Sequence, residues 1–116
     1  MGAFVLPLAK DRVEAWKGWV RELRGPRAEA FEAFNRRMGL SAHRTWLGWG
    51  SMGTHAIVVV EGVGEAHFLD RLATETEPFA TWYRERLTEL HGLDPSKRLE
   101  HHSILCVDWA EVPATV

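Results

Sequence analysis

Histidine is the residue type in this chain that is best suited to acid–base chemistry, because imidazole titrates near neutral pH. His43 and His55 lie near the two ends of a predicted hairpin, around a glycine-rich turn. They could approach one another if the strand register pairs them, and would then supply a general acid and a general base at a cavity mouth. The alternative is two half-exposed histidines at strand ends, with local hydrogen bonds only.

His91 is the third candidate catalytic residue. It lies in the last turn of a predicted helix, directly before Gly92. The helix dipole favours a cation there, so one interpretation is that His91 caps the helix C-terminus. The other interpretation is that His91 lines a pocket, because Trp82 and Tyr83 lie nearby on the same helix.

The sequence offers few candidates for metal ligands or nucleophiles. His101 and His102 are adjacent in a predicted strand, so their side chains point to opposite faces and cannot easily bind one ion. Glu100 and His102 share a face, but two ligands are too few for a metal site. We therefore predict no metal and no other cofactor. Cys106, the only cysteine, has no basic group beside it and is predicted to be a buried apolar residue.

A set of aromatic side chains could line a space for a flat, apolar ligand between helices and sheet. The chain has six tryptophans, and several aromatic residues recur at helical spacing. Arg86 is a cation on the same apolar stripe, and it requires an anionic partner, either a carboxylate of the protein or one of a ligand. The alternative for each aromatic residue is ordinary core packing. The predicted ligand-binding residues are Trp16, Trp46, Phe79, Trp82, Tyr83 and Arg86.

Four strands and two interrupted helices must position these residues. The apolar periodicity of the first helical region breaks at Gly25 and Pro26, and a second helix begins near Pro78 and closes at Gly92. The predicted strands are Ala3–Leu8, Ala42–Leu47, His55–Glu61 and His101–Trp109, and a short helix is predicted from Glu65 to Thr74.

The order βαββαβ predicts an α+β fold, with a four-stranded antiparallel sheet and helices on one face in the ferredoxin-like arrangement. The strand around Ala56–Val60 does not alternate apolar and polar residues. A strand that is apolar on both sides belongs to a sheet that is covered twice. The helices can cover one face, so we expect a second copy of the chain to cover the other.

Length and charge narrow the class of protein further. At 116 residues the chain is predicted to be a single ferredoxin-like domain over residues 1–116. A net charge of −2 offers no basic face for nucleic acid. The first residues lack the features of a signal peptide, and no run reaches the ~18 apolar residues of a membrane span. We therefore expect a cytoplasmic protein that binds neither nucleic acid nor membrane.

The strand order, the length and the doubly apolar strands resemble the dimeric α+β barrel superfamily, which includes the antibiotic-biosynthesis monooxygenase-like proteins. The segments Pro78 to Tyr83 (PFATWY) and Glu89 to Asp94 (ELHGLD) are similar to a stretch in a small uncharacterised bacterial family of that group. The resemblance implies a homodimer that packs through the sheet face, with a ligand cavity between sheet and helices in each protomer. It implies no particular activity.

Two functions remain open on the sequence. The first is a cofactor-independent enzyme, of the cyclase, isomerase or monooxygenase type, that acts on a small apolar or aromatic molecule. The second is a non-catalytic dimer that binds a small ligand or a partner protein.

Overall fold

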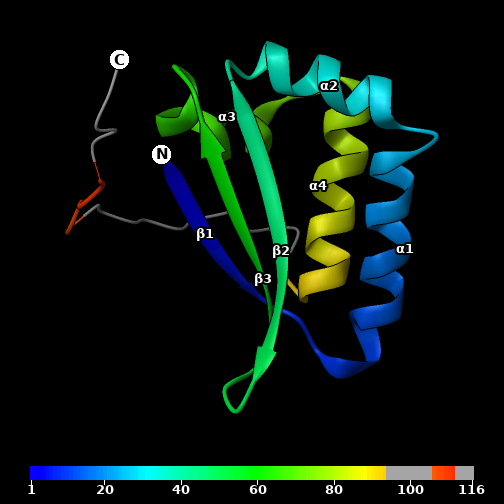
Figure 1. Cartoon of the computed structure of the whole chain (residues 1–116). Helices are drawn as coiled ribbons and strands as arrows, with labels where there is room; N and C mark the ends of the chain where they lie inside the picture. Colours follow the sequence, from blue (N-terminus) through cyan, green and yellow to red (C-terminus); the bar gives the residue numbers. More distant parts are fainter. Residues whose placement is uncertain (94–105, 112–116) are drawn as a thin grey trace.

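The computed structural model describes residues 1–93 and 106–111 (Figure 1). It shows an α+β fold, with a three-stranded antiparallel sheet and four α-helices within these residues. The strands are β1 (Gly2–Pro7), β2 (Ala42–Gly50) and β3 (Gly53–Glu61). The helices are α1 (Val13–Arg24), α2 (Ala28–Arg37), α3 (Phe68–Thr74) and α4 (Pro78–His91), and single 3₁₀ turns, Lys10–Arg12 and Glu65–His67, precede α1 and α3.

The strand order in the sheet is β1-β3-β2, so β3 is the central strand. Residue Val58 of β3 pairs with Phe4 of β1 and with Thr45 of β2. Because side chains alternate along a strand, these three residues point to the same face. The same rule places Ala56, Val60 and His43 on this face, which the helices cover.

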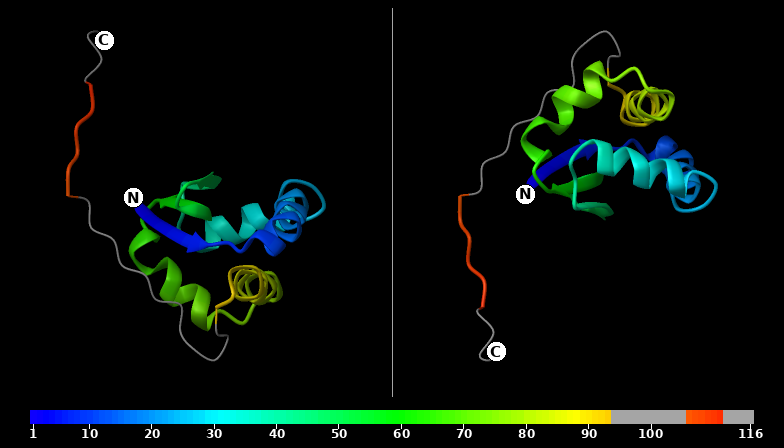
Figure 2. Two further views of the ribbon diagram at one scale, coloured as in Figure 1. Left: turned by 90° about the horizontal axis from the view of Figure 1, so that it is seen from below. Right: turned by 90° about the horizontal axis from the view of Figure 1, so that it is seen from above.

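The helices confirm the two predicted interruptions. Gly25 and Pro26 separate α1 from α2, and α4 begins at Pro78, with the Glu77 carboxylate accepting a hydrogen bond from the Ala80 amide at 3.1 Å. Gly92 ends α4 in the left-handed conformation, with φ of 67°. A glycine is favoured there because it lacks a Cβ. Figure 2 shows α3 and α4 on one side of the sheet, with α1 and α2 beyond β2.

The core lies between the sheet and these helices. Phe34, Met38, Leu72 and Val60 are its most deeply buried large side chains. They come from α2 and its C-terminus, from α3 and from the central strand. Burial of such apolar area is the main favourable term in the stability of a domain of this size.

A tight junction of glycines connects the end of β3 to the end of α2. The amide of Gly64 donates to the carbonyl of Gly39 at 3.0 Å, and Ser41 donates to Glu61 at 2.7 Å. A Cβ at Gly64 would lie 1.8 Å from the carbonyl oxygen of Met38, so only glycine fits this approach. The junction fixes where β2 begins, and therefore where His43 lies.

The predicted fourth strand is wrong for the residues that can be compared. Cys106 to Glu111 form no regular secondary structure and are exposed, including Val107 and Trp109. Cys106 is exposed too, and not buried as predicted. The rest of the predicted strand, His101 and His102 included, lies outside the described residues. The described order is therefore one strand, a pair of helices, a hairpin and a second pair of helices, and the described residues hold no closing strand of a βαββαβ unit.

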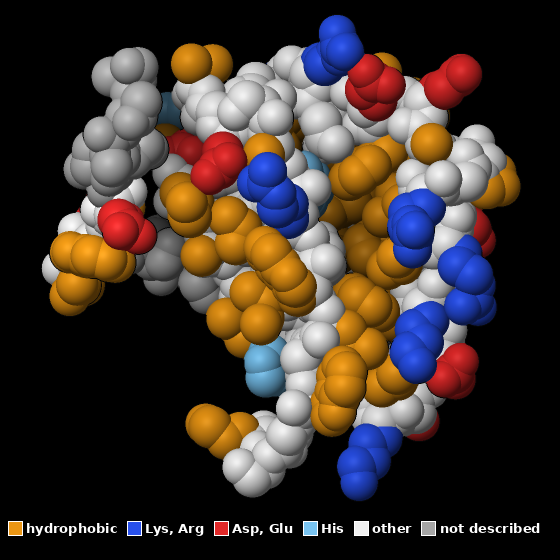
Figure 3. Space-filling model, viewed as in Figure 1, with side chains coloured by type: hydrophobic (Ala, Val, Ile, Leu, Met, Phe, Trp, Pro, Cys, Tyr) orange, Lys and Arg blue, Asp and Glu red, His pale blue; other side chains and the backbone are white. Residues whose placement is uncertain are grey.

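The second face of the sheet is apolar and carries no helix in the described part of the chain (Figures 2 and 3). We call it the open face. It presents Val5, Trp46 and Ile57, which pair in register across the three strands. Val5 is 54% exposed and Trp46 is 49% exposed. The prediction of strands that are apolar on both sides is therefore confirmed for β1 and β3, and no helix or strand of the described residues covers this side.

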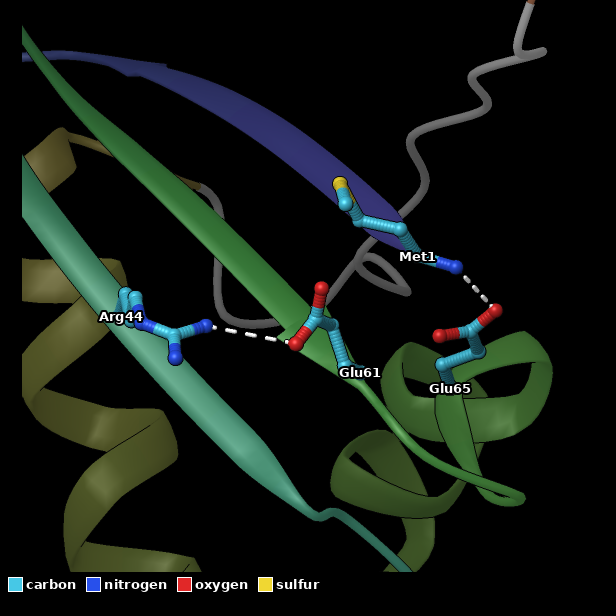
Figure 4. Close-up of polar contacts among 4 residues, drawn as sticks. All are labelled: Met1, Arg44, Glu61 and Glu65. Carbon is cyan, nitrogen blue, oxygen red and sulfur yellow. Dashed lines mark hydrogen bonds and ion pairs between the residues drawn. The ribbon is translucent and has the colours of Figure 1, made fainter. Parts of the chain in front are cut away.

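Charged residues border the open face at one end (Figure 4). Arg44 of β2 lies 3.3 Å from the carboxylate of Glu61 on β3. The N-terminal ammonium of Met1 forms a second ion pair there, with Glu65. The open face is thus an apolar patch with a positive and a negative group side by side at its edge.

No helix among the described residues is long and apolar enough to cross a membrane.

Candidate functional site

His43 is the centre of a chain of hydrogen bonds that joins three elements. Its Nδ1 lies 2.9 Å from Oδ1 of Asn35 on α2, and its Nε2 lies 3.3 Å from the hydroxyl of Tyr83 on α4. An amide oxygen can only accept, so Nδ1 carries the proton and donates to Asn35. Nε2 then has a lone pair, which accepts from Tyr83. Both ring nitrogens of His43 are therefore engaged.

Burial determines the protonation states of His43 and Tyr83 in this chain of hydrogen bonds. Loss of hydration lowers the pKa of His43 to about 4, because burial disfavours the charged ring. Burial also raises the pKa of the Tyr83 hydroxyl well above its ordinary value. At pH 7 the hydrogen-bonded side chains are therefore all neutral, with Tyr83 as a phenol and His43 as a neutral imidazole.

Aromatic rings surround His43. The rings of Phe31 and His43 lie 5.1 Å apart between centroids, and Phe68 meets His43 edge-on at 5.6 Å. Phe34 and Trp19 pack against Tyr83 at 5.3 and 5.4 Å. Such distances are typical of favourable aromatic pairs. They hold the hydrogen-bonded chain in an apolar setting.

A groove of about 380 Å³ opens beside His43, between the end of α1, helix α2 and the start of β2. We call it the His43 groove. Figure 3 shows a hollow with hydrophobic side chains between β2 and the helices. Its volume is within the range of roughly 300–1,000 Å³ of small-molecule pockets. Its lining includes apolar residues, with Glu32, Arg36 and Ser41 as polar groups; the apolar part is Leu23, Ala28, Phe31, Leu40 and Ala42.

The structure does not bring His43 and His55 together. His43 pairs with Val60, whereas His55 pairs with Gly48 and Pro7 at the other end of β3. The two side chains also point to opposite faces of the sheet. The predicted acid–base pair is therefore wrong in its geometry. The ring of His55 lies over Gly48, where a Cβ would come within 2.9 Å of Nε2.

His91 is buried and neither caps its own helix nor lies near His43. Its Nδ1 is 2.8 Å from the carbonyl oxygen of Pro7 at the end of β1. Burial lowers the pKa of His91, and the hydrogen bond to Pro7 opposes that change only in part. His91 thus fastens the end of α4 to the sheet.

The predicted aromatic residues do not surround one open space. Trp16, Phe79 and Tyr83 are buried core residues, as the packing alternative predicts. Trp46 lies on the open face, on the opposite side of the sheet from the other rings. Trp46 is three positions from His43 on the same strand, and an odd number of steps along a strand reverses the face to which a side chain points.

The two remaining predicted residues have partners in the protein. The guanidinium of Arg27 lies 3.9 Å from the ring centroid of Trp82, a cation–π contact. Arg86 forms an ion pair with Glu89 at 2.8 Å, so the anionic partner that we expected is a carboxylate one helical turn away. Neither residue lines the His43 groove.

Phe31 and Asn35 were missed as site residues by the sequence analysis. They are four positions apart, so they share one face of α2. An asparagine on the apolar face of an amphipathic helix requires a hydrogen-bond partner when it is buried. That requirement is the signal that could have identified Asn35.

Among the residues that the structure describes, no group of three or more His, Cys, Asp or Glu side chains could hold a metal ion. Comparison of the chain with protein-family models, with curated proteins and with solved structures gives no match.

Proposed function

We propose that the protein is a homodimer that binds a small, flat, apolar molecule in the His43 groove, without catalysing its conversion. The observation that carries the proposal is the placement of Phe31 and His43, whose rings lie 5.1 Å apart at a groove of about 380 Å³. Two rings held at this distance offer apolar faces to a third ring.

The hydrogen bonds of His43 favour binding over catalysis. A general base needs a free lone pair within reach of its substrate. In His43 that lone pair accepts from the Tyr83 hydroxyl. A pKa of about 4 also makes His43 a weak base at neutral pH. A ligand therefore meets a neutral, fixed ring.

The polar groups of the groove restrict the ligand. Glu32 and Arg36 form an ion pair at 2.6 Å, and both line the groove. The carboxylate retains acceptor capacity, so it can bind one hydroxyl or N–H group of a ligand. We therefore propose a ring compound with a single hydrogen-bond donor.

An NMR titration with 2-naphthol tests the groove. We expect chemical-shift changes at the backbone amides of Ser41, Ala42 and His43. Ala28→Trp fills the groove from the exposed start of α2 and should abolish these changes. Ala33→Trp, an exposed position of α2 that does not line the groove, is the matched control and should leave them intact. Changes that persist in Ala28→Trp would contradict the proposal.

A second copy of the chain is the proposed cover of the open face. Its edge carries Arg44 and Glu61, two opposite charges 3.3 Å apart. A two-fold axis that passes between these two residues would bring each of them near its opposite on the other copy, so the surface can be complementary to itself. The resemblance to dimeric α+β barrels supports the same arrangement of two copies. We also propose that the protein is located in the cytoplasm.

Sedimentation of two variants tests the dimer. Trp46→Glu places a charge on the open face, next to Ile57 of the central strand, and should yield monomers at micromolar concentration. Trp49→Glu changes an even more exposed tryptophan on the other face of β2 and should leave the dimer intact. A wild-type protein that sediments as a monomer would refute the proposed dimer but would leave the proposed ligand binding in the His43 groove untouched.

A catalytic role for His43 is the second candidate function. The chain from Asn35 through His43 to Tyr83 favours it, because such a chain fixes the tautomer of the imidazole. It requires the substrate to replace Tyr83 at Nε2. Turnover of an aromatic substrate that is lost in His43→Gln, with folding unchanged, would establish it.

A further inference from the structure

His91 has one ring nitrogen without a hydrogen-bond partner among the described residues. The carbonyl of Pro7 can only accept, so Nδ1 of His91 carries the proton and Nε2 has a lone pair. Nε2 is buried, and no described donor reaches it. The His91 side chain itself is only 7% exposed. A buried acceptor without a partner is costly, and it gains free energy when a donor arrives.

His91 lines a cavity of about 480 Å³ at the end of β1, where β1, the β2–β3 turn and the end of α4 meet. We call it the His91 cavity. It is separate from the His43 groove. On the central strand β3, His43 pairs with Val60, whereas Pro7, the hydrogen-bond partner of His91, pairs with His55. These two positions of β3 are about 17 Å apart along an extended strand.

The other lining residues define a complementary ligand. Leu8 and Leu90 supply apolar surface, and Lys10 and Arg12 supply two positive charges. No ion pair is recorded for either cation within the described residues, and no carboxylate is among the lining residues. The cavity therefore combines an unpaired acceptor, an apolar wall and a positive rim.

We propose that the His91 cavity binds a small hydroxy acid with a hydrocarbon body. Its hydroxyl donates to Nε2 of His91, and its carboxylate lies near Lys10 and Arg12. Its hydrocarbon part contacts Leu8 and Leu90. Nε2 of His91 is closed off from solvent, so the ligand must displace a lining side chain to reach it. The new hydrogen bond between the ligand hydroxyl and Nε2 offsets the free-energy cost of that displacement.

NMR of the full-length protein labelled with ¹⁵N in histidine tests this proposal, with 4-hydroxybenzoate as the probe. Free protein should show His91 as the Nδ1–H tautomer. Saturation with the probe should move the Nε2 resonance toward the position of a hydrogen-bonded acceptor. Benzoate, which lacks the hydroxyl, should bind roughly tenfold more weakly and leave Nε2 unmoved.

Variants of the rim separate this cavity from other sites. Lys10→Gln combined with Arg12→Gln should weaken binding of 4-hydroxybenzoate at least tenfold. Arg24→Gln, an exposed cation at the end of α1 that does not line the cavity, should have no effect. An Nε2 resonance that stays unmoved at saturation, equal binding of benzoate, or unchanged affinity in the double variant would each overturn the proposal. All of these variants retain His91 and its bond to Pro7.

Discussion

The hydroxyl of Tyr83 donates a hydrogen bond to Nε2 of His43 across 3.3 Å and so joins helix α4 to strand β2. The bond lies within a cluster of aromatic rings, where both partners are neutral. It connects two segments that are 40 residues apart in the chain. It therefore bears on the stability of the core and on the shape of the His43 groove at the same time.

Removal of the Tyr83 hydroxyl should destabilise the protein. Tyr83→Phe leaves the Nε2 lone pair of His43 buried and unpaired, which should lower the free energy of unfolding by about 1–2 kcal/mol. Urea denaturation measures this change. In a His43→Phe background the same substitution should cost much less, because the acceptor is already absent. Equal costs in both backgrounds would show that the bond contributes nothing.

Acid should destabilise the protein through His43. The pKa of His43 in the folded protein is about 4, below the value of about 6.5 in an unfolded chain. The unfolded state therefore binds the proton more readily. The contribution of His43 to stability is complete above pH 6.5 and is lost as the pH falls toward 4. At ~1.4 kcal/mol per pH unit the loss totals about 3 kcal/mol.

Denaturation of His43→Gln between pH 7 and pH 4 isolates this contribution from that of other groups. The variant should show a shallower pH dependence than the wild type across this range. His55→Gln, which changes a histidine on the open face, should keep the wild-type slope. A His43→Gln profile parallel to that of the wild type would contradict the lowered pKa.

Gly64 should tolerate no side chain. Its substitution by alanine places a Cβ 1.8 Å from the Met38 carbonyl oxygen, so the backbone junction between α2 and β3 must move. We expect a loss of about 2 kcal/mol or more in stability. Gly50→Ala is the matched control, because no atom lies within 4 Å of its Cβ position. Similar melting temperatures for the two variants would argue against this close approach.

Glu77 should stabilise the start of α4. Its carboxylate accepts from the Ala80 amide at 3.1 Å and lies 2.9 Å from the Arg37 guanidinium. Glu77→Ala removes the cap and should cost about 1 kcal/mol in thermal or chemical denaturation. Glu85→Ala, at an exposed position of the same helix, should lower the free energy of unfolding by at most a few tenths of a kcal/mol. The capping role fails if both variants unfold alike.

Local patterns were sufficient to predict the helices and three of the strands. Gly25 with Pro26, and Pro78 with Gly92, are signals that act within a few residues of where the chain must turn or start a helix. The segment His101–Trp109 was predicted as a strand from its pattern of apolar residues. Val107 and Trp109 are exposed instead, and β-propensity without a pairing partner does not specify a strand.

The site was harder to predict because its geometry is tertiary. The position of His43 along β2 was clear, but its partners come from α2 and α4. Strand register decides that His55 faces the other way, and register cannot be read from a histidine and a glycine-rich turn. The aromatic residues were identified as a set, yet the pattern could not separate core rings such as Phe79 from an exposed ring such as Trp46.

The measurement that tests the central claim most directly is an isotope-filtered NOE spectrum of the protein with 2-naphthol. The claim is that the ligand lies in the His43 groove against two rings. We predict NOEs from the naphthol protons to the ring protons of Phe31 and His43. NOEs to Val5 and Trp46 alone would place the ligand on the open face and contradict the claim, as would an absence of NOEs to either ring at saturation.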